Sequence, residues 1–131
     1  MQSINFDDGL KRLAINGDEN RVIVVNPTDV GIVARYREKL PEIKKLSAET
    51  ENFEEIPHIL DKKVREFVDY IIGLPVSETV FGKTNCISMA GGQTIFENFL
   101  TAYMEYMKPE IKAEYERSKK RVEKYTAQLP E

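Results

Sequence analysis

The sequence predicts an α+β fold that is mainly α: a small N-terminal antiparallel β-meander packed on a helical body, with a long C-terminal helix. Three observations predict this class. Short runs rich in β-branched residues, separated by turn signals, fill residues 1–26 and predict strands. Apolar residues then recur at intervals of three and four, which predicts helices. A chain of 131 residues is long enough for one hydrophobic core. We expect one domain over 1–131, with the meander at 1–26, a helical body at 27–107 and a protruding helical tail at 108–131.

The N-terminal strands are predicted from their turns. Residues 4–6 and 10–15 flank an Asp-Asp-Gly turn at 7–9, and an Asn-Gly-containing turn at 16–20 separates 10–15 from 21–25. Asn-Gly and Asp-Gly dipeptides supply the positive φ angles that tight hairpins need. The sequence therefore predicts a three-stranded meander. Such a small sheet is marginal alone and has to pack against helices.

Two helices are predicted next. The segment 26–29 (NPTD) provides a cap, a proline for the first turn and an acidic residue, so a helix should start there. Pro41 should kink or end this helix, because the residue before a proline avoids the helical region. Residues 47–55 are polar and predict a connector. Pro57 then opens a second helix, which Gly73 ends.

The remaining signals predict a long final helix. Ser77 can cap a single turn that ends at Gly82, and a loop follows over 83–92. A Gly-Gly pair within that loop is compatible with an anion-binding nest, but a hinge or a tight turn is favoured. Thr94 and Glu97 match a capping box in front of an apolar run that stays helical almost to the chain end.

The apolar face of this last helix changes width at Pro109. Before Pro109 the face is wide enough for domain core, whereas after it the face narrows to a two-position heptad pattern that includes Ser118 and Leu129. Tyrosine and methionine make adaptable contacts at interfaces. We predict a contact surface for a partner or a second copy, the alternative being a helix end that lies back on its own domain. The predicted contact residues are Tyr103, Met107, Ile111, Tyr115, Val122 and Tyr125.

Candidate catalytic and metal-binding residues are sparse. Residues 77–84 end in Gly-Lys-Thr like a phosphate-binding loop, but Ser77 replaces the first glycine and poor helix formers follow. Cys86 and His58 are each the only residue of their type, so a cysteine nucleophile or a zinc site would have to combine Cys86 with His58 or with carboxylates. Packing of a small thiol is favoured for Cys86 and a surface position for His58. We expect no enzyme, no cofactor and no metal.

Charge and hydropathy restrict the partners and the location. The net charge is −3 and the basic residues of 117–124 are interleaved with glutamates, which favours a solvated helix face over a nucleic-acid contact. The longest apolar runs, 22–25 and 70–76, fall far short of the roughly 20 residues that span a bilayer. The N-terminus does not resemble a signal peptide, and one cysteine permits no internal disulfide. These features predict a cytoplasmic protein that binds neither nucleic acid nor membrane.

Several segments resemble small proteins from phage and prophage tail-gene clusters of Gram-positive bacteria. They are INFDDG (4–9), ING (15–17), VNPTD (25–29), VFGKTNC (80–86) and GGQTIFENFL (91–100). Proteins of this kind lie near the tape-measure gene and resemble tail assembly chaperones. The resemblance implies a non-enzymatic role in the bacterial host cytoplasm, in which the chain binds the tape-measure protein during tail assembly. Tail-tube subunits are a further candidate partner, and a homo-oligomer is compatible with the pattern. The alternative function is a minor structural component of the particle, in the tail or at the head–tail joint.

Overall fold

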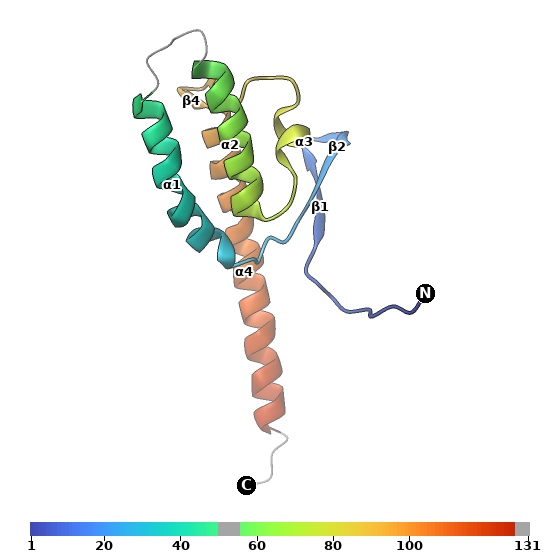
Figure 1. Ribbon diagram of the computed structural model, residues 1–131. Helices are drawn as coiled ribbons and strands as arrows, with labels where there is room; N and C mark the ends of the chain where they lie inside the picture. The colour runs from blue at the N-terminus through green and yellow to red at the C-terminus, as the bar shows by residue number, and fades with distance from the viewer. Residues whose placement is uncertain (50–55, 128–131) are drawn as a thin grey trace.

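The computed structural model describes residues 1–49 and 56–127, with side chains described at 1–45 and 58–127. It confirms the predicted class, an α+β fold that is mainly α with an N-terminal hairpin and a long C-terminal helix (Figure 1). The elements in chain order are β1 (Lys11–Ile15), β2 (Asp18–Val25), α1 (Gly31–Glu49), α2 (Ile56–Ile72), α3 (Ser77–Phe81), β3 (Met89–Ala90), β4 (Gln93–Thr94) and α4 (Ile95–Ala127).

The N-terminal sheet has two strands, so the predicted three-stranded meander is wrong. β1 and β2 pair antiparallel, and Asn16 and Gly17 form their turn with φ angles of 52° and 75°. Positive φ at both central residues is the hairpin geometry that Asn-Gly favours. Residues 4–6 form no strand, because the chain changes direction between these residues and the start of β1. Asp8 marks that bend, since its carbonyl oxygen accepts a hydrogen bond from Asn26 Nδ2 at 3.2 Å.

Helix α1 differs from its prediction at both ends. It begins at Gly31, because the side chains of Asn26 and Asp29 hold the preceding segment in turns: Asn26 Oδ1 accepts from Thr28 N at 2.9 Å and Asp29 Oδ1 accepts from Gly31 N at 2.9 Å. It then continues through Pro41 to Glu49, so the helix does not end at Pro41, which was one of the two outcomes predicted there. The predicted connector therefore loses 47–49 to the helix, and its remainder, 50–55, lies outside the described residues.

Packing against α2 explains why the proline does not end α1. The rings of Tyr36 and Phe67 lie 5.7 Å apart, and Ile43, beyond Pro41, packs against the core. Arg35 on α1 also donates from Nε and Nη2 to the carbonyl oxygen of Ile71 at 2.9 and 2.8 Å. Contacts on both sides of the proline thus offset the cost of the backbone hydrogen bond that its ring removes.

Helix α2 is the centre of the core. Figure 1 shows it between α1 on one side and α3 with the hairpin on the other, while the first half of α4 passes behind it. Gly73 ends α2 with a φ of 83°, as its sequence position predicts. Ile32 and Ile43 of α1 are partly buried against the core. The buried apolar side chains come from β2, α2, α3, α4 and the loops beside them: Ile23, Val25, Val64, Phe67, Val68, Ile71, Ile72, Val76, Val80, Phe81, Cys86, Tyr103 and Met107.

Helix α4 starts at the predicted capping box. Thr94 Oγ1 accepts from Glu97 N at 3.2 Å, while Glu97 Oε1 accepts from Thr94 N at 3.4 Å. The Gly-Gly pair just before it forms the tight turn between β3 and β4, with positive φ at both glycines. At 33 residues α4 is roughly 50 Å long, and its second half extends beyond the rest of the molecule (Figure 1). None of the described helices combines the length and apolar character that a membrane crossing requires.

Candidate contact surface

The second half of α4 is the most exposed helical segment of the described chain. From Lys108 to Ala127 every residue is exposed except Glu110 and Ala113, which are half-buried. The last fully buried side chain of α4 is Met107. In Figure 1 this half of the helix extends away from the other elements, and it does not lie back on its own domain.

The predicted contact residues fall into two groups. Tyr103 and Met107 are only 5% exposed and belong to the core, so the prediction that they form part of a contact surface conflicts with their position. A wide apolar face of a helix packs inward, and both residues lie on that face before Pro109. The exposed group is Ile111, Tyr115, Val122 and Tyr125, which we call the C-terminal seam.

The C-terminal seam keeps the geometry that its spacing predicts. Tyr115, Val122 and Tyr125 are 69%, 61% and 67% exposed, and Ile111 is 37% exposed. Ser118 is exposed within the seam, whereas Leu129 lies outside the described residues. Spacings of three and four place these side chains on one stripe of a continuous helix, where a second helix can pack.

Charged residues border the seam on both sides. Arg117 and Glu114 form an ion pair three residues apart, and lysine, arginine and glutamate occupy most of the other positions. Exposed pairs of this kind contribute little to stability. In two-stranded helical interfaces, flanking charges of this kind select the partner and its orientation. The surface therefore has the chemistry of a helix–helix contact.

The segment that resembles a phosphate-binding loop has a different structure. Arg65 Nη2 on α2 donates to the carbonyl oxygens of Gly82 and Thr84 at 2.8 and 2.7 Å, and Cys86 N donates to Asp61 Oδ1 at 2.8 Å. A phosphate loop directs several backbone N–H groups at one anion. Here carbonyl oxygens converge on a cation instead, so the segment is the helix stop and loop that its sequence favours.

Cys86 is a packing residue in this structure. Its side chain is completely buried, and Sγ lies 3.7 Å from the carbonyl oxygen of Asp61. Burial, together with the neighbouring Asp61, raises the pKa of the thiol to about 12. A thiol with such a pKa stays protonated at neutral pH, whereas a cysteine nucleophile needs the thiolate. His58 is exposed at the start of α2, as predicted.

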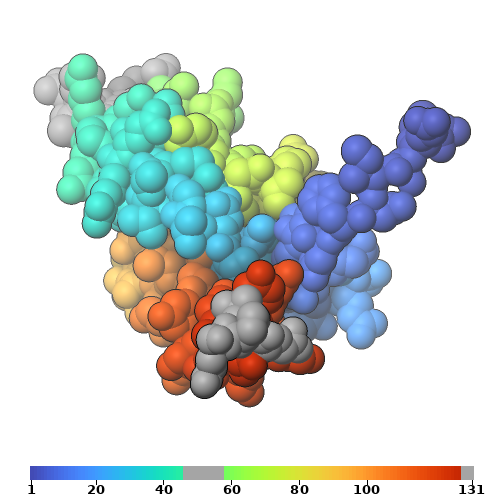
Figure 2. All heavy atoms as spheres, turned by 90° about the horizontal axis from the view of Figure 1, so that it is seen from below, coloured from blue at the N-terminus to red at the C-terminus, as the bar shows by residue number. Residues whose placement is uncertain are grey.

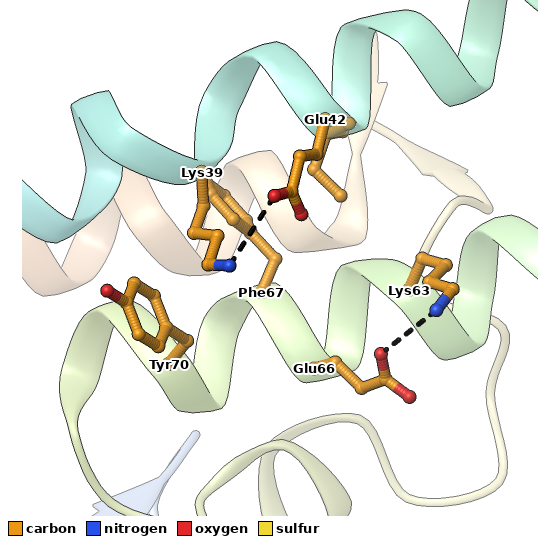
Figure 3. Close-up of a pocket in the computed structure, with 7 residues that line it drawn as sticks. Lys39, Glu42, Lys63, Glu66, Phe67 and Tyr70 are labelled. Carbon is orange, nitrogen blue, oxygen red and sulfur yellow. Dashed lines mark hydrogen bonds and ion pairs between the residues drawn. The ribbon is translucent and has the colours of Figure 1, made fainter.

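A small pocket lies between α1 and α2, and its charged groups are paired with one another (Figure 3). Lys39 Nζ is 3.4 Å from Glu42 Oε1, and Lys63 Nζ is 3.5 Å from Glu66 Oε2. Phe67 lies on the inner side of the pocket. Each charge is satisfied by a neighbour on its own helix, so these groups do not converge on one point as catalytic or ligand-binding groups would. Within residues 1–49 and 56–127, no three His, Cys, Asp or Glu side chains gather in a way that could hold a metal ion.

The sequence patterns did not predict a groove between β1 and α4. Its volume is about 700 Å³, and its walls include five consecutive residues, 12–16, together with Phe99, Ala102 and Tyr103 of α4. These two walls lie some 90 residues apart in the sequence, so local periodicity carries no signal for their juxtaposition.

Comparisons with protein-family models, with curated proteins and with solved structures identify no significant match to this chain. The function therefore has to be argued from the surfaces themselves.

Proposed function

We propose that this protein is a non-enzymatic phage tail assembly chaperone-like protein, which binds the tape-measure protein through the C-terminal seam. The observation that carries the proposal is the seam itself: four large apolar side chains on a helix that stands clear of its own core. Apolar stripes left uncovered on a folded protein are characteristic of interaction sites. The resemblance to tail-gene-cluster proteins supports the choice of partner and of the bacterial cytoplasm.

The heptad spacing of the seam indicates the shape of the partner. A narrow two-position stripe is complementary to another amphipathic helix, which places its own apolar positions between the seam residues. Such a contact shields an apolar segment of the partner from solvent until assembly continues. A holding role of this kind requires binding and release, with no chemical step.

Co-expression with the tape-measure protein of the same gene cluster tests the proposal. The wild-type chain should co-purify with the tape-measure protein and increase its soluble fraction. The double variant Val122→Glu and Tyr125→Glu should weaken binding at least about tenfold, because each buried apolar side chain contributes roughly 1.5–3 kcal/mol. Circular dichroism should show an unchanged fold, since both residues are exposed.

The matched control is the double variant Lys120→Gln and Ala127→Glu. It makes the same change in net charge on the opposite face of the same helix segment. The control should bind like the wild type. Equal binding by the seam variant and the control would show that the seam is not the binding surface. No binding by the wild type would show that the tape-measure protein is not the partner. Stoichiometric presence of the chain in purified particles would support a structural component instead, because a chaperone leaves.

A further inference from the structure

The first eight residues form an extended arm whose apolar side chains are largely exposed to solvent. Ile4 and Phe6 are 89% and 76% exposed, and every residue from 1 to 8 is exposed. Figure 2 shows this segment, in dark blue, projecting away from the body of the molecule. Ile4 and Phe6 alternate with the polar Ser3 and Asn5, which is the pattern of a strand with one buried face.

The base of the arm is fixed in a direction that leads away from its own sheet. Asp7 Oδ1 accepts from Gly9 N at 3.0 Å, and the carbonyl oxygen of Asp8 accepts from Asn26 Nδ2 at 3.2 Å. Asn26 is itself held, because its Oδ1 accepts from Thr28 N at 2.9 Å. These contacts join the start of the arm to the end of β2, and they replace the hairpin that the sequence of residues 4–15 predicts.

The groove between β1 and α4 has the properties that such a strand requires. Among the described residues β1 pairs with β2 alone, so its other edge is open. Consecutive residues 12–16 line the groove. Neighbouring side chains of a strand point to opposite faces, so a groove that touches every residue in turn must run along the strand. An open edge offers unpaired backbone donors and acceptors, and Phe99 and Tyr103 offer an apolar wall opposite it.

We propose that the N-terminal arm of each chain inserts into this groove of a second copy and adds a strand to the open edge of β1. Ile4 and Phe6 then face the aromatic wall on α4, and main-chain hydrogen bonds join the arm to β1. The inserted residues 1–6 carry no charged side chain, which suits a groove whose lining is mostly apolar, with Arg12 as its single charged residue. The six residues before this fixed base span roughly 20 Å when extended, enough to reach a neighbouring molecule.

Reciprocal exchange of the two arms closes a dimer and leaves no open β1 edge. Exchange of identical segments is a common route to homodimers, because each chain supplies the same arm and the same groove. This inference does not depend on the proposed function, since the C-terminal seam is not part of the arm or of the groove.

Cross-linking between two different variants tests the placement directly. Ser3→Cys marks the arm and leaves Ile4 and Phe6 intact, and Ala102→Cys marks the exposed side of the groove. After the two variants are mixed and incubated to exchange subunits, a short bis-maleimide should join them into a covalent dimer. Ser3→Cys mixed with Lys124→Cys is the control, because Lys124 lies 18 residues further along α4 than Tyr106, the last residue of that helix in the groove. The buried Cys86 gives the background with the wild-type chain alone.

Two results would overturn the inference. The first is the absence of an arm-to-groove product above the control. The second is a chain carrying both Ser3→Cys and Ala102→Cys that cross-links only within itself, which would show that the arm folds onto its own sheet as the sequence pattern predicts.

Mass measurement by light scattering gives an independent test. The wild-type chain should have the mass of a dimer, and Ile4→Asp with Phe6→Asp should halve it. Ala102→Glu should do the same, because it places bulk and a charge in the groove where the apolar side chains of Ile4 and Phe6 would pack. Thr101→Glu, the neighbouring exposed position outside the groove, should stay dimeric, as should Val122→Glu with Tyr125→Glu. A monomeric wild type, or a dimer that survives the arm substitutions, would contradict the proposal.

Discussion

Asp61 on α2 holds the loop that follows α3. Its carboxylate accepts hydrogen bonds from Cys86 N at 2.8 Å and from Arg65 Nε at 3.1 Å, and Arg65 in turn binds the loop carbonyl oxygens. Burial alone would raise the pKa of Asp61, but the hydrogen bonds from Cys86 and Arg65 outweigh burial and hold the pKa below its ordinary value. One carboxylate thus connects the central helix to the segment that leads into α4.

Asp61→Asn should destabilise the protein by about 1–3 kcal/mol at neutral pH, because Arg65 loses its charged partner in a partly buried site. Urea unfolding followed by circular dichroism measures the change. Glu66→Gln is the control, since it also neutralises a carboxylate of α2, but in an exposed pair, and should stay within about 0.5 kcal/mol of the wild type. A similar cost for both variants would contradict this role of Asp61.

The same carboxylate predicts a pH dependence. A pKa lowered by folding contributes stability that is present above the unfolded-state value of about 3.9 and is lost as the pH falls through the lower folded-state value. Wild-type stability should therefore fall between about pH 5 and pH 3, and Asp61→Asn should fall less over the same interval. Melting curves across this range measure both slopes, and equal slopes would show that other groups dominate acid unfolding.

Cys86 should react with a thiol reagent only when the protein opens. The thiol is buried and its pKa of about 12 keeps the thiolate scarce. Its modification by a chromogenic disulfide reagent should be slow in buffer and complete within the mixing time in denaturant. Fast reaction in buffer would show that the loop between α3 and α4 opens frequently.

At the scale of the elements, both long helices pass through a proline. Pro41 lies within α1 and Pro109 within α4, and each removes one backbone hydrogen bond. α1 packs on α2 on both sides of Pro41, whereas the described part of α4 has no buried side chain after Pro109. The proline therefore divides α4 into a packed half and a weaker half that carries the C-terminal seam.

Pro109→Ala should restore the missing hydrogen bond and stabilise the exposed half of α4 by up to about 3 kcal/mol. Amide hydrogen exchange should slow over residues 110–125 and stay unchanged in α2. The equivalent change at an exposed position without a proline, Lys112→Ala, should leave the exchange rates nearly the same. Unchanged exchange in Pro109→Ala would mean that the proline does not limit this half of the helix.

At the scale of the whole molecule, the core and the proposed contact surface are separate. Within the described part of α4 no side chain of the core cluster lies beyond Met107, and the C-terminal seam begins at Ile111. Deletion of residues 113–131 should therefore change the free energy of unfolding by less than about 1 kcal/mol while abolishing binding to the tape-measure protein. Urea unfolding and co-purification measure the two effects, and a large loss of stability would show that the extension supports the fold.

The sequence by itself determined the features that depend on a few neighbouring residues. The Asn16-Gly17 turn, the helix stop at Gly73, the capping box at Thr94 and the stripe of the C-terminal seam all have the structure that their local patterns predict. Each is encoded by a backbone preference or by a spacing of three to four residues, which holds without knowledge of the rest of the chain.

Only the tertiary structure decided which apolar faces are covered and by what. Pro41 is tolerated because α2 packs beside α1. Tyr103 is part of the core because folding buries it in the cluster that includes Ile23 and Phe81. Asn26 turns residues 4–6 away from the strand pairing that their pattern predicts. Each of these contacts joins residues that are far apart in the sequence. A local pattern cannot specify which distant residue of the chain folding will bring into contact.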